Sequence, residues 1–144
     1  MLVQSILNSK KEASVITVTP DTLVSDAARL LSDKKIGTVM VSSDGEAADG
    51  ILSERDIVRE LGQNGPGCLT DPVSSYMTSK LVTCTAQSNV EEVLKQMTTG
   101  RFRHMPVLED GKLKGLISLG DVVKAQLAEV AMEKDALEGM IMGH

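Results

Sequence analysis

The sequence predicts an α+β fold: two pseudo-symmetric β-α-β-β-α units packed sheet to sheet, followed by an extended C-terminal helix. Three observations predict it. The stretch GILSERDIV at Gly50 returns as GLISLGDVV at Gly115. In both halves, short strands rich in β-branched residues alternate with segments of helical apolar spacing. Finally, a three-stranded sheet with helices on one face cannot bury its apolar surface alone, whereas two such units packed together can.

The repeat covers most of the 144 residues. ITVTP at Ile16 aligns with VTCTA at Val82, an offset of 66, and the Asp-Gly pairs at Asp44 and Asp110 keep that offset. One extra residue in EAADG, relative to KLKG, shortens the offset to 65 at Gly50 and Gly115. We therefore expect unit 1 at residues 1–66, with a lead-in over 1–14. Unit 2 is expected at residues 67–144, with a lead-in over 67–80.

Each unit is expected to begin with a short strand, VITV in unit 1 and LVTC in unit 2. Helices follow, capped by Thr22 or Ser25 in unit 1 and by Ser88 or Asn89 in unit 2. Their apolar faces consist of Val24, Ala27, Ala28 and Leu31, and of Val90, Val93, Leu94 and Met97. Next come the strands GTVMVS and HMPVLE, each followed by an Asp-Gly pair typical of a hairpin. The third strands, GIL and GLI, lead directly into helices from Ser53 and Ser118.

The last helix, about residues 119–141, continues past the repeat. Its apolar residues form what we call the C-terminal stripe: Val123, Leu127, Val130, Leu137 and Ile141. Charged residues occupy the other faces: Glu129, Glu133, Lys134 and Glu138. Because the stripe is left over once both units are complete, we expect it to contact a partner helix in a homodimer. Docking onto its own domain is the alternative.

Composition excludes several functions. The formal net charge of −5 argues against nucleic-acid binding, and one Tyr, one Phe and no Trp leave no stacking platforms for single strands. No apolar run approaches the ~18 residues of a membrane span, and the N-terminus does not resemble a signal peptide. Cys68 and Cys84 have neither CxxC spacing nor nearby histidines, so we expect reduced structural thiols and a cytoplasmic protein.

The paired Ser-x-x-Asp motifs have two interpretations. Ser53 with Asp56, and Ser118 with Asp121, have the spacing of a capping box, which would make them helix starts. Alternatively, the glycine before each third strand lets a ligand or a neighbouring backbone come close. A helix N-terminus offers N–H groups to an anion, and a carboxylate beside it can accept two hydrogen bonds from a ribose diol. A nucleoside phosphate matches that combination.

These motifs, in this order and twice, resemble a tandem pair of CBS domains, also called a Bateman module. The resemblance runs from about Met1 to Lys124 and includes the Thr-x-x-Pro opening at Thr17, although Ala86 stands where the second copy usually has Pro. It implies two clefts between the units, homodimers, and adenosine-containing ligands: AMP, ADP, ATP, S-adenosylmethionine or NAD(H).

The resemblance also implies roles for individual residues. Asp56 and Asp121 would hold ribose hydroxyls, with Ser53 and Ser118 on the ribose and phosphate side. The adenosine portion would contact Thr17, Thr83, Pro106 and the backbone around Met40 and Met105.

Cations for the phosphate are concentrated in unit 2. GRFRHMP supplies Arg101, Arg103 and His104, and the two arginines share a face if the strand extends that far. A solvated edge for the arginines, and a plain strand-end histidine, are the alternatives. The matching residues in unit 1, Lys35, Gly37 and Thr38, are poorer in charge, although Arg55 could add a cation there. The two clefts should therefore differ, and His104 could make phosphate binding pH-sensitive.

Three functions follow for comparison. The first is a regulatory module that binds AMP, ATP or NAD(H) and signals to an unknown effector protein. The second is a ligand-free interaction module that assembles through its C-terminal helix. The third, an enzyme, would need a nucleophile, a metal cluster or a catalytic motif, and the sequence has no GxxxxGK[ST] or HExxH. We therefore expect no catalytic activity, no catalytic cofactor and no metal.

Overall fold

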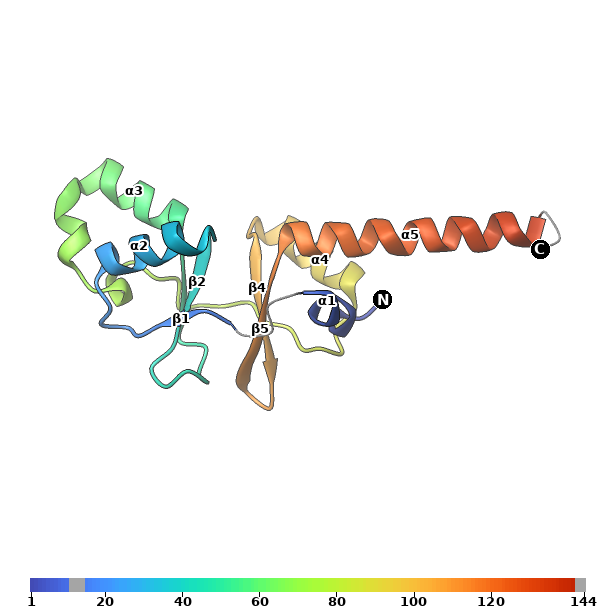
Figure 1. The fold of residues 1–144 in the computed structure, drawn as a ribbon, viewed down its shortest axis with the longest axis horizontal. Helices are drawn as coiled ribbons and strands as arrows, with labels where there is room; N and C mark the ends of the chain where they lie inside the picture. The colour runs from blue at the N-terminus through green and yellow to red at the C-terminus, as the bar shows by residue number, and fades with distance from the viewer. Residues whose placement is uncertain (11–14, 142–144) are drawn as a thin grey trace.

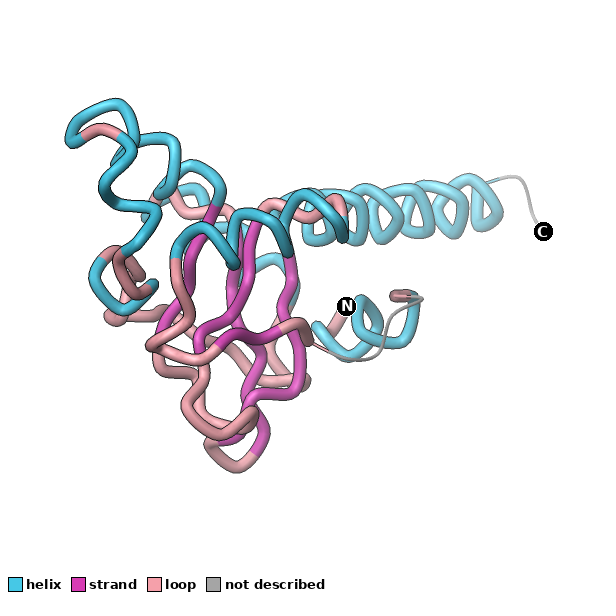
Figure 2. The backbone as a smooth tube through the Cα atoms, turned by 60° about the vertical axis from the view of Figure 1, so that its left-hand side comes forward, coloured by secondary structure: helices cyan, strands magenta, loops and turns pink. Residues whose placement is uncertain are grey.

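The computed structural model of the protein describes residues 1–10 and 15–141. Two small sheets lie beside each other at the centre, and helices cover their outer sides (Figure 1). The view turned by 60° shows the same strands together, with the last helix extending away from them (Figure 2). The expected arrangement of two α+β units meeting at their sheets is confirmed.

Unit 1 contains the sheet β1-β2-β3 and two covering helices. β1 (Thr17–Val18) pairs parallel with β2 (Thr38–Val41), and β2 pairs antiparallel with β3 (Gly50–Ser53). The helices are α2 (Val24–Lys34) and α3 (Glu54–Asn64), followed by the 3₁₀ helix η1 (Pro66–Thr70). The apolar face expected on α2 is confirmed, because Val24, Ala27 and Leu31 are buried in the core of unit 1. Eight residues, not a tight turn, join β2 to β3.

Unit 2 repeats this plan with differences. After the 3₁₀ helix η2 (Val73–Ser75) come α4 (Val90–Gly100), β4 (His104–Glu109), β5 (Lys112–Ser118) and α5 (Leu119–Ile141). β4 and β5 are antiparallel. Their turn is the expected Asp-Gly hairpin, in which Asp110 and Gly111 both have positive φ, 52° and 77°, as a type I′ turn requires.

The strand expected over LVTC in unit 2 is wrong, because this segment makes only a single parallel bridge between Cys84 and Val107. In unit 1 the corresponding strand is held by the Met40 N–H, which donates to the Ile16 carbonyl at 3.2 Å. The residue matching Met40 is Pro106, which has no N–H to donate. One ladder hydrogen bond is therefore lost, and the sheet of unit 2 has two strands.

The lead-ins cross over between the units. The first forms α1 (Val3–Ser9), whose Val3 and Ile6 are buried in the core of unit 2. The second contributes Val73, which is buried in the core of unit 1. The crossings are pseudo-symmetric: the Val3 N–H donates to the Ser88 carbonyl at 2.9 Å, and the Val73 N–H donates to the Thr22 carbonyl at 2.8 Å. The core of each unit is therefore completed by the lead-in of the other unit.

Helix starts follow the expectations in three of four cases. Asn89 caps α4, and its Oδ1 accepts from the N–H groups of Glu91 and Glu92. Ser53 and Ser118 start α3 and α5. The caps expected for α2 are wrong: the N-cap is Leu23 and has no side-chain cap, because the Thr22 hydroxyl accepts from the Thr19 N–H instead, and Ser25 lies inside the helix.

Helix α5 leaves the body after about three turns. Val122 is buried and Ala125 packs beside it, whereas from Val130 onward nearly every side chain is exposed. Within the described residues, no helix combines the length and apolarity that crossing a membrane requires.

Candidate functional site

The clearest site is a cleft between the two units, which we call the Arg-rich cleft. Its volume is about 370 Å³, inside the range of roughly 300–1,000 Å³ typical of small-molecule sites. Six residues predicted from the sequence line it together: Ser53, Arg55, Asp56, Arg101, Arg103 and His104. The first three come from unit 1 and the others from unit 2, so a ligand in this cleft would touch both units.

Ser53 and Asp56 line the Arg-rich cleft at the start of α3. The Asp56 Oδ2 accepts from the Ser53 N–H at 2.9 Å and from its hydroxyl at 3.0 Å, and the Ser53 Oγ accepts from the Asp56 N–H at 3.2 Å. The expected capping box is therefore present. The other carboxylate oxygen, Oδ1, accepts from Arg59 Nη2 at 2.8 Å. Since Arg59 is about half exposed, this oxygen can exchange its partner without disturbing the cap.

The arginines reach the cleft differently from the expectation. Arg101 ends α4 in the left-handed conformation, with φ 58°, and β4 begins only at His104. The idea that Arg101 and Arg103 share a strand face is therefore wrong. Both still line the cleft, which holds four arginines against the carboxylates of Glu54 and Asp56. This surplus of positive charge favours an anionic ligand.

His104 lies where the units touch. Its Nδ1 is 3.2 Å from the Thr38 hydroxyl oxygen, across the interface. Burial lowers its pKa below the ordinary value of 6.5; the charge of Asp121 opposes this shift, and Lys10 and Arg103 reinforce it. At neutral pH the imidazole is therefore largely uncharged, and His104 adds a hydrogen-bonding group to the cleft but not a full positive charge.

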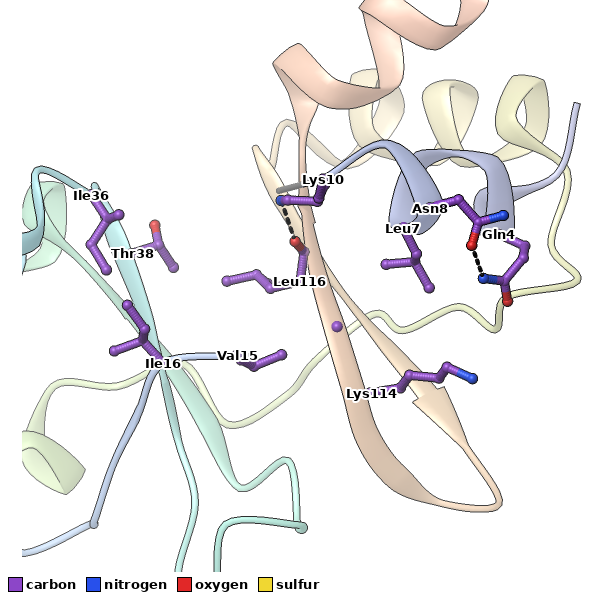
Figure 3. Close-up of a pocket in the computed structure, with 11 residues that line it drawn as sticks. Gln4, Leu7, Asn8, Lys10, Val15, Ile16, Ile36, Thr38, Lys114 and Leu116 are labelled. Atoms are coloured by element: carbon purple, nitrogen blue, oxygen red, sulfur yellow. Dashed lines mark hydrogen bonds between the residues drawn. The ribbon is translucent and has the colours of Figure 1, made fainter. Parts of the chain in front are cut away.

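A second cleft, of about 310 Å³, lies at the pseudo-symmetric position, and we call it the Lys10 cleft. Ile16, Ile36 and Thr38 of unit 1 face Leu116 and Lys10 across it (Figure 3). Among the described residues that line it, Lys10 and Lys114 are the charged ones. It is poorer in charge than the Arg-rich cleft, as expected from the unequal repeats.

Asp121 is already paired beside the Lys10 cleft. Lys10 Nζ donates to Asp121 Oδ2 and to the Leu116 carbonyl, both at 2.9 Å. The same oxygen accepts from the Ser118 N–H at 2.9 Å. Burial acts to raise the pKa of Asp121, but the bonds from Ser118 and Lys10 outweigh it and lower the pKa. Asp121 and Ser118 do not line this cleft, whereas Lys10, the ion-pair partner of Asp121, does.

The glycines before the third strands accommodate the crossed lead-ins. A Cβ on Gly50 would lie 2.5 Å from the Met77 Sδ and 3.2 Å from the Thr78 carbonyl oxygen. On Gly115 it would lie 2.7 Å from Leu7 Cδ2. Of the two expected reasons for a glycine here, the structure therefore supplies the close neighbour.

The remaining predicted residues do not line either cleft. Thr17 pairs with Met40 between β1 and β2, and Thr83 is exposed. Met40, Met105 and Pro106 are buried, so their side chains serve the core. Contact of their backbone with an adenosine stays a prediction.

Several residues that line the clefts were not predicted from the sequence: Lys10, Thr38, Glu54, Arg59, Thr78 and Phe102. Arg59 had a usable signal, because it lies three positions after Asp56 on one helix. Lys10 had none, since it is 111 positions from Asp121. Within residues 1–10 and 15–141, no three His, Cys, Asp or Glu side chains gather closely enough to hold a metal ion.

Comparison with known proteins agrees with this architecture. The sequence matches the CBS domain family over residues 6–63 and 73–128. It is 32% identical over 148 residues to the mitochondrial CBS domain-containing protein CBSX3 of Arabidopsis thaliana, covering 98% of this chain and 72% of that protein.

Solved structures show the same fold. A CBS-domain containing protein of Agrobacterium tumefaciens is 41% identical, with a TM-score of 0.82 over 88% of this chain and 99% of that one. A CBS domain protein of Pyrobaculum aerophilum, complexed with AMP, is 22% identical, with a TM-score of 0.76 over 92% of this chain and 99% of that one. The double match to the family, the internal repeat and the paired units lead to one conclusion: the chain belongs to the CBS domain family, as a tandem pair of CBS domains.

Proposed function

We propose that this protein is a regulatory module that binds an adenine nucleotide in the Arg-rich cleft. In this proposal Asp56 Oδ1 accepts the ribose hydroxyls after Arg59 gives way, and Ser53 lies at the ribose and phosphate side. Arg55, Arg101 and Arg103 bind the phosphate. One observation carries the proposal: a single cleft contains four arginines and the Asp56 carboxylate, whose Oδ1 bonds the half-exposed Arg59 and can exchange this partner for a ligand.

The relatives support an adenosine-containing ligand at the level of the family. The Pyrobaculum aerophilum protein, which shares the fold, is complexed with AMP. The excess of arginine favours a phosphorylated ligand over S-adenosylmethionine, because guanidinium groups match the geometry and charge of phosphate. AMP, ATP and NAD(H) all satisfy these requirements.

We further propose that the two clefts differ in affinity. In the Arg-rich cleft the diol acceptor is shared only with a half-exposed arginine of its own helix. In the Lys10 cleft a ligand would have to displace Lys10 from both Asp121 and the Leu116 carbonyl. Ser118 and Asp121 would contribute to this weaker second site, and the proposed contacts of the adenosine portion with Thr17, Thr83, Met40, Met105 and Pro106 are divided between the two clefts.

Signalling would follow from the position of the Arg-rich cleft between the units. A ligand that contacts Asp56 in unit 1 and Arg103 in unit 2 binds most tightly to one arrangement of the units and therefore shifts the population towards it. The output would be contact with an effector protein, and we infer no catalytic role. The free, buried cysteines Cys68 and Cys84 support a reducing compartment such as the cytoplasm.

The test is calorimetric titration with AMP, ADP, ATP, NAD, NADH, S-adenosylmethionine and GTP, on the wild type and two matched variants. Asp56→Asn keeps the shape of the cap but removes the charge. We expect it to weaken adenine-nucleotide binding by at least about tenfold, because a hydrogen bond to a charged group contributes roughly 1.5–3 kcal/mol.

Asp121→Asn is the control, because it makes the same change at the pseudo-symmetric site. It should leave the tighter binding event unchanged. Equal affinity of wild type and Asp56→Asn, with both folded, would refute the ribose assignment. Heat from none of the seven ligands would refute the nucleotide proposal and favour the interaction module, for which the exposed C-terminal stripe is the supporting observation.

A further inference from the structure

The outer half of helix α5 has no partner within the described chain. Residues 130–141 project from the body in both views (Figures 1 and 2), and Leu137 and Ile141 are 58% and 76% exposed. A helix of about 12 residues without tertiary packing is marginal in water. The structure therefore contains a helical segment that packing on the body does not stabilise.

The C-terminal stripe is separate from the face that docks onto the body. Val122, Ala125 and Gln126 are buried or partly buried there, and the stripe lies roughly 100° further around the helix. Its members follow a heptad pattern, with Leu127 and Ile141 at positions a and with Val123, Val130 and Leu137 at positions d. Lys134 occupies the a position between Leu127 and Ile141. This is the pattern of a two-helix seam.

We propose that α5 pairs in antiparallel orientation with α5 of a second copy of this chain. In an antiparallel pair each a position packs against a d position of the other helix. One register uses every member of the stripe: Leu127 packs against Leu137 of the second copy, Val123 against Ile141, and Val130 against Lys134. Three apolar or mixed layers thus form on each side of the two-fold axis.

Charge selects this orientation over the parallel one. A parallel pair in register would place Lys134 against Lys134 at an a position, and Glu133 against Glu138 at the flanking positions, twice. The antiparallel pair places Lys134 against Val130, and brings Lys124 at a flanking position beside Glu138 of the second copy, twice. Glu133 meets Glu133 near the axis, where both Lys134 ammonium groups are close enough to offset the repulsion.

The orientation is tested by cross-linking. Leu127→Cys and Leu137→Cys are prepared separately and treated, alone and mixed, with a short thiol-to-thiol cross-linker; the parent chain, whose cysteines are buried, is the background control. We expect covalent dimers mainly in the mixture, because identical positions lie about 15 Å apart along an antiparallel pair. Efficient cross-linking of each variant with itself would overturn the antiparallel arrangement.

The interface is tested by sedimentation across a range of protein concentrations. Leu137→Glu should raise the dimer dissociation constant by at least about tenfold, because a buried leucine is lost from each copy. Met132→Glu is the matched control: Met132 is 59% exposed on the same helix but off the stripe, so its dimer should persist. A wild-type chain that is monomeric at every concentration, or equal effects of both variants, would overturn the proposal.

Charge reversal tests the register independently. Lys124→Glu and Glu138→Lys should each weaken the dimer, since each places like charges beside one another. The double variant restores opposite charges and should return the dissociation constant to near the wild-type value. Failure of the double variant to recover, in a folded protein, would contradict the proposed register.

Discussion

His104 shows how a single residue couples the units. It is the first residue of β4, pairs with Ser118 across its own hairpin, and bonds Thr38 of the other unit. The neighbouring charges partly cancel, since Asp121 and Glu54 favour protonation whereas Lys10 and Arg103 oppose it. Burial decides the direction, and the pKa of the folded protein lies below the ordinary 6.5.

This direction predicts a pH dependence of stability. Below pH 6.5 the unfolded chain protonates His104 more readily than the folded one does, so the unfolded state binds more protons there and is favoured. The stability linked to neutral His104 is therefore present above pH 6.5 and is lost as the pH falls through the lower folded-state pKa. Urea unfolding of wild type and His104→Gln at pH 7.5 and 5.5 measures this. The wild type should lose more free energy of unfolding than the variant, and parallel losses would contradict the prediction.

At the scale of the secondary-structure element, the N-cap residue contributes to the stability of each helix. Asn89→Ala should destabilise the protein by about 1 kcal/mol, because two N–H groups at the start of α4 lose their acceptor. Ser25→Ala is the control in the other unit: the sequence makes Ser25 a candidate cap, but it lies inside α2. Its free energy of unfolding should stay within a few tenths of a kcal/mol of wild type. Chemical denaturation compares the two, and equal losses would show that Asn89 is not the cap.

Such local features are the ones that sequence predicts well. The capping boxes at Ser53 and Ser118, the apolar faces of α2 and α4, and the hairpin at Asp110 all depend on residues within four positions of one another. The grouping of Ser53, Asp56 and Arg103 in one cleft was not predicted, because these residues belong to different units and no local pattern joins residues of two units.

Long-range features escaped prediction for physical reasons. The missing strand near Cys84 depends on its partner Pro106, which lacks the donor that would extend the ladder. Lys10 and Asp121 form an ion pair although they are 111 positions apart, and no pattern in the sequence around either residue indicates this contact. Gly50, which the sequence indicated could make room for a ligand or for a neighbouring backbone, makes room for Met77 and Thr78 of the crossed lead-in.

At the scale of the whole molecule, the crossed lead-ins tie the two cores together. Ile6 is buried among the residues of α4, β4 and β5, and Val73 among those of α2, β2 and β3. Neither unit completes its core from a contiguous stretch of chain. Movement of one unit would therefore be transmitted to the other through these covalently linked core segments, and a ligand bound between the units, as proposed above, would act on both.

The crossing of the lead-ins predicts which unit is destabilised by a substitution in each lead-in. If each lead-in packed on its own unit, the opposite result would be expected. Ile6→Ala removes a buried side chain near the N-terminus and should cost about 2–5 kcal/mol, and Val73→Ala should cost somewhat less. Hydrogen exchange then locates the damage. Ile6→Ala should speed exchange first in α4, β4 and β5, which lie 84 to 112 residues along the chain from the substitution. Val73→Ala should instead speed exchange first in α2, β2 and β3. Each variant serves as the control for the other. If Ile6→Ala instead loosens α2 and Val73→Ala loosens α4, the lead-ins pack on their own units in solution and the coupling between the cores is lost with them.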